Sequence, residues 1–274
     1  MIRTILSDLW TSRELFFQLT QRDLKLRYRQ AVMGFAWALF LPVLTISAGL
    51  ILRMAISNSG GSATPPSLGG IAIKSWAWAF FAGAMNFATI SLLANASLVT
   101  KIYFPREVLP LAAIVAQGAD SLIGLATLLL VGHWMGFHWS VQLFWVPVLM
   151  LSLLLLTTGL AFLFACANLF FRDVKYILQV LLTFGIFFTP VLLDLSSFKQ
   201  YSRLMMLNPL SPILEGLRLT LVEHTSLLHT IIAPSGALIW SPWALVYAMV
   251  VGVASTLIGM VAFRRSASYF AEYY

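Results

Sequence analysis

The densest group of charged side chains in the sequence is a basic cluster near the N-terminus. Between positions 22 and 29 the chain carries four cations with a tyrosine among them: Arg22, Lys25, Arg27, Tyr28 and Arg29. No further charged residue follows until Arg53. A basic cluster beside a long apolar run can attract the anionic headgroups of a membrane. It can also simply anchor the cytoplasmic end of a membrane helix, and both interpretations stay open.

Patterns typical of catalysis or metal binding are not found. His224 and His229 are five positions apart and would not share a helical face, and no nucleophile–base pair can be picked out. A phosphate-binding loop needs a lysine after glycine, but none of the lysines follows a glycine. We therefore predict no metal, no cofactor and no enzymatic activity in this chain. Any work driven by ATP has to come from a partner.

Asp120 is the only formally charged residue between positions 108 and 171. Carriers coupled to protons or sodium usually hold ionisable groups at mid-membrane, and a single acid supports ion coupling only weakly. The alternatives are that Asp120 is protonated, or that it is hydrogen-bonded to a neighbouring Ser or Gln across a helix interface.

The composition is typical of a membrane protein, in which charged residues are few. Charged residues make up 10% of the 274 residues and hydrophobic residues 60%, whereas a soluble domain carries roughly a quarter charged residues. The mean hydropathy is +0.88. We expect one membrane domain, in which the net charge of +7 reflects orientation in the bilayer and not binding of nucleic acid. The single cysteine, Cys166, is expected to be a small core residue.

A helix needs about 20 apolar residues to cross the hydrocarbon core. Six segments fulfil this requirement, and they cover residues 32–52, 75–96, 108–131, 141–167, 176–193 and 243–263. The predicted fold is an all-α integral membrane protein with six transmembrane helices.

The distribution of basic residues orients these six spans. Six basic residues precede the first span, and two each occupy the loop after the second span, the loop after the fourth span and the C-terminal tail. Only five lie on the other side of the membrane: Arg53, Lys74, Lys199, Arg203 and Arg218. Because the richer side is normally cytoplasmic, both termini are expected inside. Six tryptophans, at 76, 78, 134, 139, 240 and 243, would then cluster at the outer boundary.

Three segments that do not span the membrane are also distinctive. Residues 1–20 have the pattern of an amphipathic helix at the inner interface; the alternative is a helix that merely packs beneath the bundle. The inner loop after the second span mixes large apolar and charged groups (KIYFPRE, 101–107). Such a mixture is typical of a surface that docks another protein, although an interfacial turn is the simpler explanation.

The outer stretch after the fifth span contains two short apolar pieces around Asn208–Pro209. Ser211 and Pro212 predict a helix start, with Ser211 as the cap, and Ile213, Leu214 and Leu217 would form its apolar face. Each piece is long enough to enter the membrane but not to cross it. Re-entrant backbone is stable only where protein or a water-filled cavity surrounds it, so we expect this stretch to line or close a pathway. The alternative is a pair of helices on the outer surface.

The motifs RDLKLRYRQAVMGFAWALFLP (22–42), KIYFPREVLPL (101–111), NLFFRDV (168–174) and NPLSPILEGLR (208–218) follow one another in this order. Together with six spans, they resemble the permease subunits of ABC exporters for polysaccharides, which include O-antigen, capsule and teichoic-acid exporters. The resemblance covers nearly the whole chain.

This resemblance implies a homodimer in the bacterial inner membrane, with two separate ATP-binding cassette subunits that hold ATP and magnesium beneath it. The family's interface helix falls on residues 1–29, ahead of a transmembrane domain at 30–274. Its coupling segment falls on residues 95–106, including Asn95, Lys101, Ile102, Tyr103, Phe104, Pro105 and Arg106. Its two short outer gate helices fall on residues 197–224, including Asn208, Pro209, Leu210, Ser211, Pro212, Glu215 and Arg218.

The family exports glycans attached to a polyprenyl pyrophosphate or another lipid. The resemblance therefore implies that the cluster at 22–29 receives an anionic headgroup, which suits guanidinium groups because they pair with phosphate oxygens through two hydrogen bonds. Three rivals remain: an ABC exporter of drugs or small lipids, a secondary transporter or channel without an ATPase, and a membrane-embedded enzyme.

Overall fold

The computed structural model describes residues 12–28, 40, 43–44, 47–51, 54–55, 67–101, 104–132, 140–234 and 236–267. Most of the predicted first span, 32–52, therefore lies outside the described residues, although its described positions are helical. Residues 1–11 of the predicted interface helix and the two outer tryptophans at 134 and 139 also lie outside them.

Four described helices are long and apolar enough to cross a membrane. They are α4 (Leu68–Ala94), α6 (Val108–Gly132), α7 (Val146–Phe170), which continues the 3-10 helix η2 (Val141–Trp145), and α11 (Pro242–Ser266). They correspond to the predicted second, third, fourth and sixth spans. The side chain of Ser67 caps α4 by accepting a 3.1 Å hydrogen bond from the amide of Gly70. Prolines in the first turns of α7 and α11 fit there because the first helical amides need no partner within the helix.

The second span begins earlier than the sequence predicts. The prediction began this span at Ser75 and left Lys74 in the outer loop, but α4 starts at Leu68 and includes Lys74. Lys74 can lie in this helix because the protein supplies anionic partners, described below.

The fifth predicted span, 176–193, is shorter in the structure. Helix α8 (Val174–Gly185) continues as the 3-10 helix η3 (Ile186–Phe188) and ends there. Thr189 is extended, with φ −130° and ψ 149°, as expected for the residue before a proline, because the ring of Pro190 disfavours the helical conformation at that position. This helix falls short of a full span by length.

Helices α7 and α11 pack so closely that glycines are required between them. A Cβ atom on Gly159 would lie 2.2 Å from the backbone carbon of Ser255, and one on Gly259 would lie 2.3 Å from the carbonyl oxygen of Gly159. The hydroxyl of Thr256 donates a 2.6 Å hydrogen bond to the carbonyl of Leu155 in the facing helix. Small residues and interhelical hydrogen bonds are the usual means of association between helices in lipid.

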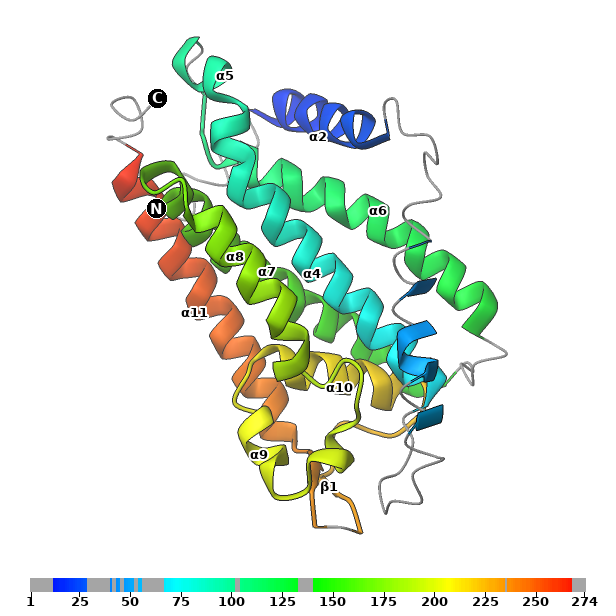
Figure 1. Cartoon of the computed structure of the whole chain (residues 1–274). Helices are drawn as coiled ribbons and strands as arrows, with labels where there is room; N and C mark the ends of the chain where they lie inside the picture. Colours follow the sequence, from blue (N-terminus) through cyan, green and yellow to red (C-terminus); the bar gives the residue numbers. More distant parts are fainter. Residues whose placement is uncertain are drawn as a thin grey trace.

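Two short helices lie across opposite ends of this bundle (Figure 1). At one end, α2 (Arg13–Tyr28) lies near α5 (Ala96–Lys101) and the start of α6. At the other end are η4 (Leu195–Tyr201), α9 (Ser202–Met205), α10 (Leu210–Leu221) and a hairpin of β1 (Ile231–Ile232) and β2 (Leu238–Trp240). We call these the α2 end and the α10 end.

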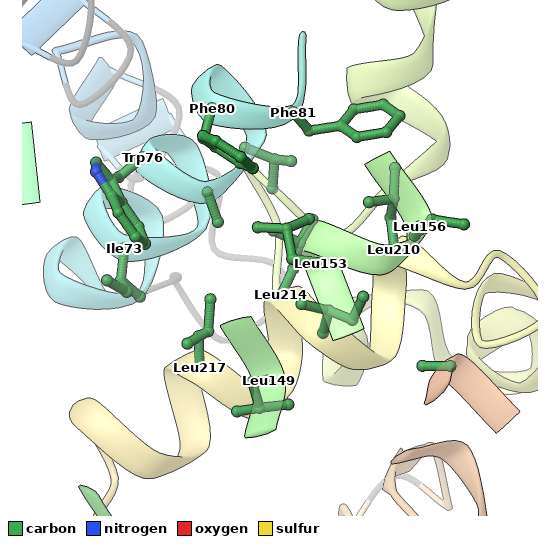
Figure 2. Close-up of a cluster of buried hydrophobic side chains, with 14 of the residues drawn as sticks. Ile73, Trp76, Phe80, Phe81, Leu149, Leu153, Leu156, Leu210, Leu214 and Leu217 are labelled. Carbon is green, nitrogen blue, oxygen red and sulfur yellow. The ribbon is translucent and has the colours of Figure 1, made fainter. Parts of the chain in front are cut away.

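The larger hydrophobic core lies towards the α10 end. Figure 2 shows side chains from α4, α7 and α10 gathered in one cluster, which includes Ile73, Trp76, Phe80, Leu149, Leu153, Leu214 and Leu217. All twelve residues of α10 are buried, and not only the expected apolar face. Trp76 and Trp240 are buried as well and donate hydrogen bonds to the carbonyls of Ser121 and Leu227, so both pack within the protein core.

Candidate functional site

A groove at the α2 end contains Arg22, the first cation of the basic cluster. Its Nη2 donates a 2.6 Å hydrogen bond to Oδ1 of Asn95, and its Nε and Nη2 lie 3.2 and 2.9 Å from Oδ1 of Asp23. The groove has a volume of about 350 Å³ and is lined by Arg22, Asp23, Leu26, Phe87, Ile90, Ser91, Ala94, Asn95 and Ala113. One charged edge therefore adjoins an apolar floor.

The surroundings of this groove suit an anionic amphiphile. A second depression on α2, of about 400 Å³, is lined by Gln18, Gln21, Arg22, Lys25 and Leu26, so Lys25 lies near Arg22. The side chain of Arg22 is 38% exposed, and a guanidinium with five N–H donors keeps capacity for a further acceptor. The side chains of Arg27 and Tyr28, and all of Arg29, lie outside the described part of the chain.

The segment 95–106 connects α4 to α6, and hydrogen bonds at its beginning and end join it to neighbouring helices. Asn95 ends α4, and its Nδ2 donates a 2.7 Å hydrogen bond to the carbonyl of Ser91. After α5, Arg106 donates a hydrogen bond to the carbonyl of Ala267, and Glu107 accepts a 2.8 Å hydrogen bond from Nε of Arg264 in α11. A movement of this segment would therefore reach α2, α4, α6 and α11 together.

The sequence predicts exposed aromatic residues in this segment, but in the structure Phe104 is buried. Phe104 is buried in a second hydrophobic cluster with Leu19, Leu92, Leu109, Phe162 and Phe263. The proline that follows allows the chain to turn over this cluster, so Phe104 supports the segment from beneath and is not an exposed aromatic residue. Lys101 is exposed, while Ile102 and Tyr103 lie outside the described residues.

A network of buried ions joins α4 to α10 at the opposite end. Nζ of Lys74 lies 2.6 Å from Oδ1 of Asp194 and 3.8 Å from Oε2 of Glu215. Nη2 of Arg218 lies 2.6 Å from Oε1 of Glu215, and Nε of Arg218 lies 3.5 Å from Asp194. Lys74 and Glu215 are fully buried, and Arg218 is 4% exposed. Arg218 also pairs with the more exposed Glu223.

This network can be buried because two cations, Lys74 and Arg218, lie close to two acids, Asp194 and Glu215. Removing an ion from water costs several kcal/mol, and only close, well-hydrogen-bonded partners offset that cost. Burial alone would raise the pKa of the Asp194 carboxyl, but the charges of Lys74 and Arg218 outweigh it and hold that pKa below its usual value. The carboxylate of Asp194 therefore stays charged at neutral pH.

The sequence placed Glu215 and Arg218 in the gate segment but missed Lys74 and Asp194. Their signal was present, because an isolated lysine at the start of an apolar run needs an anionic partner. Nothing in the local sequence indicates which acid provides it.

The start of α10 also differs from the prediction. Helix α10 begins at Leu210 after Pro209, and Asn208 takes the place expected for Ser211, because Oδ1 of Asn208 accepts a 3.1 Å hydrogen bond from the amide of Leu210. Nδ2 of Asn208 donates a 3.1 Å hydrogen bond to the carbonyl of Phe188, at the end of η3. Ser211 and Pro212 are buried within the first turn. The motif around Asn208 thus joins the end of α8–η3 to α10.

No group of three or more His, Cys, Asp or Glu side chains that could hold a metal ion is found among the described residues. Asp120 lies buried in α6, 8% exposed.

Comparison with known proteins shows the family of this chain. The family model described as ABC-2 type transporter matches residues 14–222. The O-antigen export system permease protein RfbA of Myxococcus xanthus is 30% identical over 250 residues, which cover 88% of this chain and 94% of that protein. Two proteins of the same name from Klebsiella pneumoniae are 24% identical over 266 residues, covering 94% of each chain, and 26% identical over 205 residues, covering 72% of this chain and 76% of the relative.

The family match includes all but the first residue of α2, the segment 95–106 and the whole of α10, whereas the β1–β2 hairpin and α11 follow it. This chain is a multi-pass, mainly helical membrane protein that belongs to the ABC-2 type transporter family.

Proposed function

We propose that this chain is the transmembrane subunit of an ATP-driven exporter that moves a lipid-linked polysaccharide of the O-antigen type across the bacterial inner membrane. The names of the three relatives support the substrate class. The observation that carries the proposal is the Arg22 groove, in which a cation at the edge of the bundle adjoins an apolar surface.

The anionic headgroup of the lipid binds first, at Arg22 and Lys25. A phosphate oxygen forms charge-assisted hydrogen bonds with the guanidinium, while the lipid tail stays in the bilayer beside Leu26 and Phe87. Arg27, Tyr28 and Arg29 extend the same basic surface. The excess of basic residues in the N-terminal segment, the inner loops and the C-terminal tail supports a cytoplasmic location for this end and for both termini.

The energy for transport comes from a separate subunit. Membership of the family implies an ATP-binding partner, and we propose two such subunits beneath two copies of this chain, with ATP and magnesium held there. The segment 95–106 contacts the partner, and its bonds to α2 and α11 transmit the movement. ATP shifts the equilibrium between two states only through its different affinity for them, and that difference lies in the ATPase pair.

The α10 end is the outer gate. Because α10 is buried on all sides and joined to α4 by ions, it moves together with the outer part of α4 and does not slide past it. Opening then separates whole packed units, which costs less than breaking a buried ion pair within one of them.

The decisive experiment reconstitutes the chain with its ATPase in proteoliposomes and measures ATP hydrolysis and glycan transport. We expect lipid-linked glycan to stimulate hydrolysis severalfold and small hydrophobic drugs to have no effect. Stimulation by drugs alone would favour a drug exporter, and transport by this chain without an ATPase would favour a secondary transporter; either result contradicts the proposal.

A further inference from the structure

A second groove opens between α4 and α8, beside the Arg22 groove. It has a volume of about 250 Å³ and is lined by Asn86, Phe87, Thr89 and Ile90 of α4 and by Lys175, Tyr176, Leu178 and Gln179 of α8. Phe87 and Ile90 line both grooves, so the two lie on either side of one ridge on α4. A ligand in the Arg22 groove can therefore extend over this ridge into the second groove.

The second groove holds polar groups whose hydrogen-bonding capacity is unused. Asn86 and Gln179 are exposed, and within the described part of the chain their side-chain amides form no hydrogen bond. The hydroxyl of Thr89 is buried without a partner. In contrast, Thr157 and Thr183 bond back to the carbonyl one helical turn earlier, at 2.7 and 2.8 Å. Unused polar groups within apolar helices are costly, and they usually mark a functional site.

Aromatic and cationic groups complete the groove. Phe87 and Tyr176 are 38% and 58% exposed, and Nζ of Lys175 lies 4.8 Å from the centre of the Tyr176 ring. Lys175 forms no ion pair within the described residues. The amides of Asn86 and Gln179 and the ammonium of Lys175 can exchange hydrogen bonds with the hydroxyls of a sugar, and the aromatic faces can pack against its C–H groups.

The size and position of the groove suit one sugar ring. A cavity of roughly 150 Å³ is large enough for benzene, so about 250 Å³ accommodates a six-membered ring with substituents. Asn86 precedes the end of α4 at Ala94 by eight residues, which is about 12 Å along the helix. Arg22 contacts Asn95 at that end of the helix, so Asn86 in the second groove lies about 12 Å from the Arg22 contact along α4.

A buried side chain fixes the two walls of the groove to each other. Nδ2 of Asn168 donates a 3.1 Å hydrogen bond to the carbonyl of Thr89, and its Oδ1 accepts a 3.2 Å hydrogen bond from the amide of Lys175. Asn168 is fully buried and reaches both α4 and α8 from α7. The groove is thus formed before any ligand binds, which lowers the entropic cost of binding.

We propose that the α4–α8 groove is a carbohydrate subsite that takes the first sugar of the lipid-linked glycan while the anionic headgroup lies at Arg22. This inference rests on the proposed function and deepens it, because the exporter then recognises the sugar as well as the headgroup. Asn86 and Gln179 are the residues that distinguish a sugar-bearing lipid from a bare one.

The test measures equilibrium binding of two probes to the complex of this chain and its ATPase in nanodiscs. One probe is polyprenyl pyrophosphate carrying a single N-acetylglucosamine, and the other is the same lipid without the sugar. The wild-type complex should bind the sugar-bearing probe about tenfold more tightly. Asn86→Leu and Gln179→Leu should each weaken that binding about threefold to tenfold, the worth of one or two hydrogen bonds, and leave the bare lipid unaffected.

Thr183→Val is the matched control, because Thr183 is exposed on α8 one turn beyond Gln179 and does not line the groove. It should bind both probes like the wild type. Equal binding of the two probes to the wild type would overturn the sugar subsite alone. An equal loss for both probes in the leucine variants would assign the groove to the anionic headgroup and also overturn it. If the wild type bound neither probe, the proposed function itself would fail.

Discussion

Lys74 has no exposed surface, yet it lies at the start of a helix that otherwise suits lipid. It remains there because Asp194 and Glu215 both lie within 4 Å of its ammonium. Buried ion pairs are weak evidence for stability in themselves, but removing one partner leaves an uncompensated charge. Loss of the Lys74 side chain should therefore cost more stability than the ion pairs themselves contribute to the fold.

Replacing Lys74 by Met should destabilise the chain by about 3–5 kcal/mol, because Asp194 and Glu215 then lose a buried counter-ion. The measurement is thermal unfolding of the purified complex in detergent. The double variant Lys74→Met with Glu215→Gln keeps the local charge balanced, so it should be more stable than the single Lys74 variant. A double variant that lost the sum of both single effects would contradict an ion network.

The lowered pKa of Asp194 predicts a dependence of stability on pH. Because the folded pKa lies below the unfolded value, its contribution is complete above the unfolded pKa of about 3.9. It is lost as the pH falls through the lower, folded value. Unfolding temperatures should therefore decline below about pH 4 in the wild type, and Asp194→Asn should show a smaller decline from a lower starting point. Asp173→Asn, which changes an exposed acid at the start of α8, should decline like the wild type.

Arg22 is the residue at which lipid binding is tested most directly. Arg22→Gln should raise the concentration of lipid-linked glycan that half-maximally stimulates the ATPase about tenfold or more, since a charge-assisted hydrogen bond is worth roughly 1.5–3 kcal/mol. Arg203→Gln removes the same charge from an exposed position at the α10 end and should have no such effect. An unchanged half-maximal concentration in the Arg22 variant would remove this residue from the headgroup site.

Among the helices, the α7–α11 pair depends on small residues more than any other pair described here. Gly159→Ala should cost about 1–3 kcal/mol, because the new Cβ would meet the backbone of Ser255 at 2.2 Å and force the helices apart. Gly118→Ala is the control, since its Cβ would meet only the Phe80 ring at 3.9 Å. That change should be neutral or stabilising, because alanine favours the helix by about 0.5–1 kcal/mol. Unfolding temperature in detergent distinguishes the two, and equal effects would contradict the close approach.

The hydropathy of each element was sufficient to predict α4, α6, α7 and α11 as spans. It overestimated α8–η3, because a sum over residue types does not register that Pro190 prevents a helical conformation at Thr189. The sequence also did not indicate that packing against α6 and α10 buries Trp76 and Trp240.

For the molecule as a whole, the proposed function assigns the contact with the ATPase to the α2 end and the outer gate to the α10 end. Lys101 lies exposed at the end of α5, so Lys101→Glu should reduce the amount of ATPase that co-purifies with this chain while its own unfolding temperature stays unchanged. Arg203→Glu makes the same reversal of charge at the α10 end and should retain the ATPase. Retention by both variants would place the ATPase contact elsewhere.

The sequence by itself determined the solvent, the class of fold and the order of the elements, since each of these depends on residues that are neighbours in the chain. Hydropathy, helix caps and basic loops are local properties, and they also located the two segments that became the ends of the bundle. The resemblance to polysaccharide exporters followed from four motifs in one order.

Only the tertiary structure decided which of these residues meet. Lys74 and Asp194 are 120 positions apart, Arg22 and Asn95 are 73 positions apart, and the groove between α4 and α8 needs both helices in place. The free energy of a buried charge or amide depends on partners brought close by folding, and no local sum over the sequence contains that information.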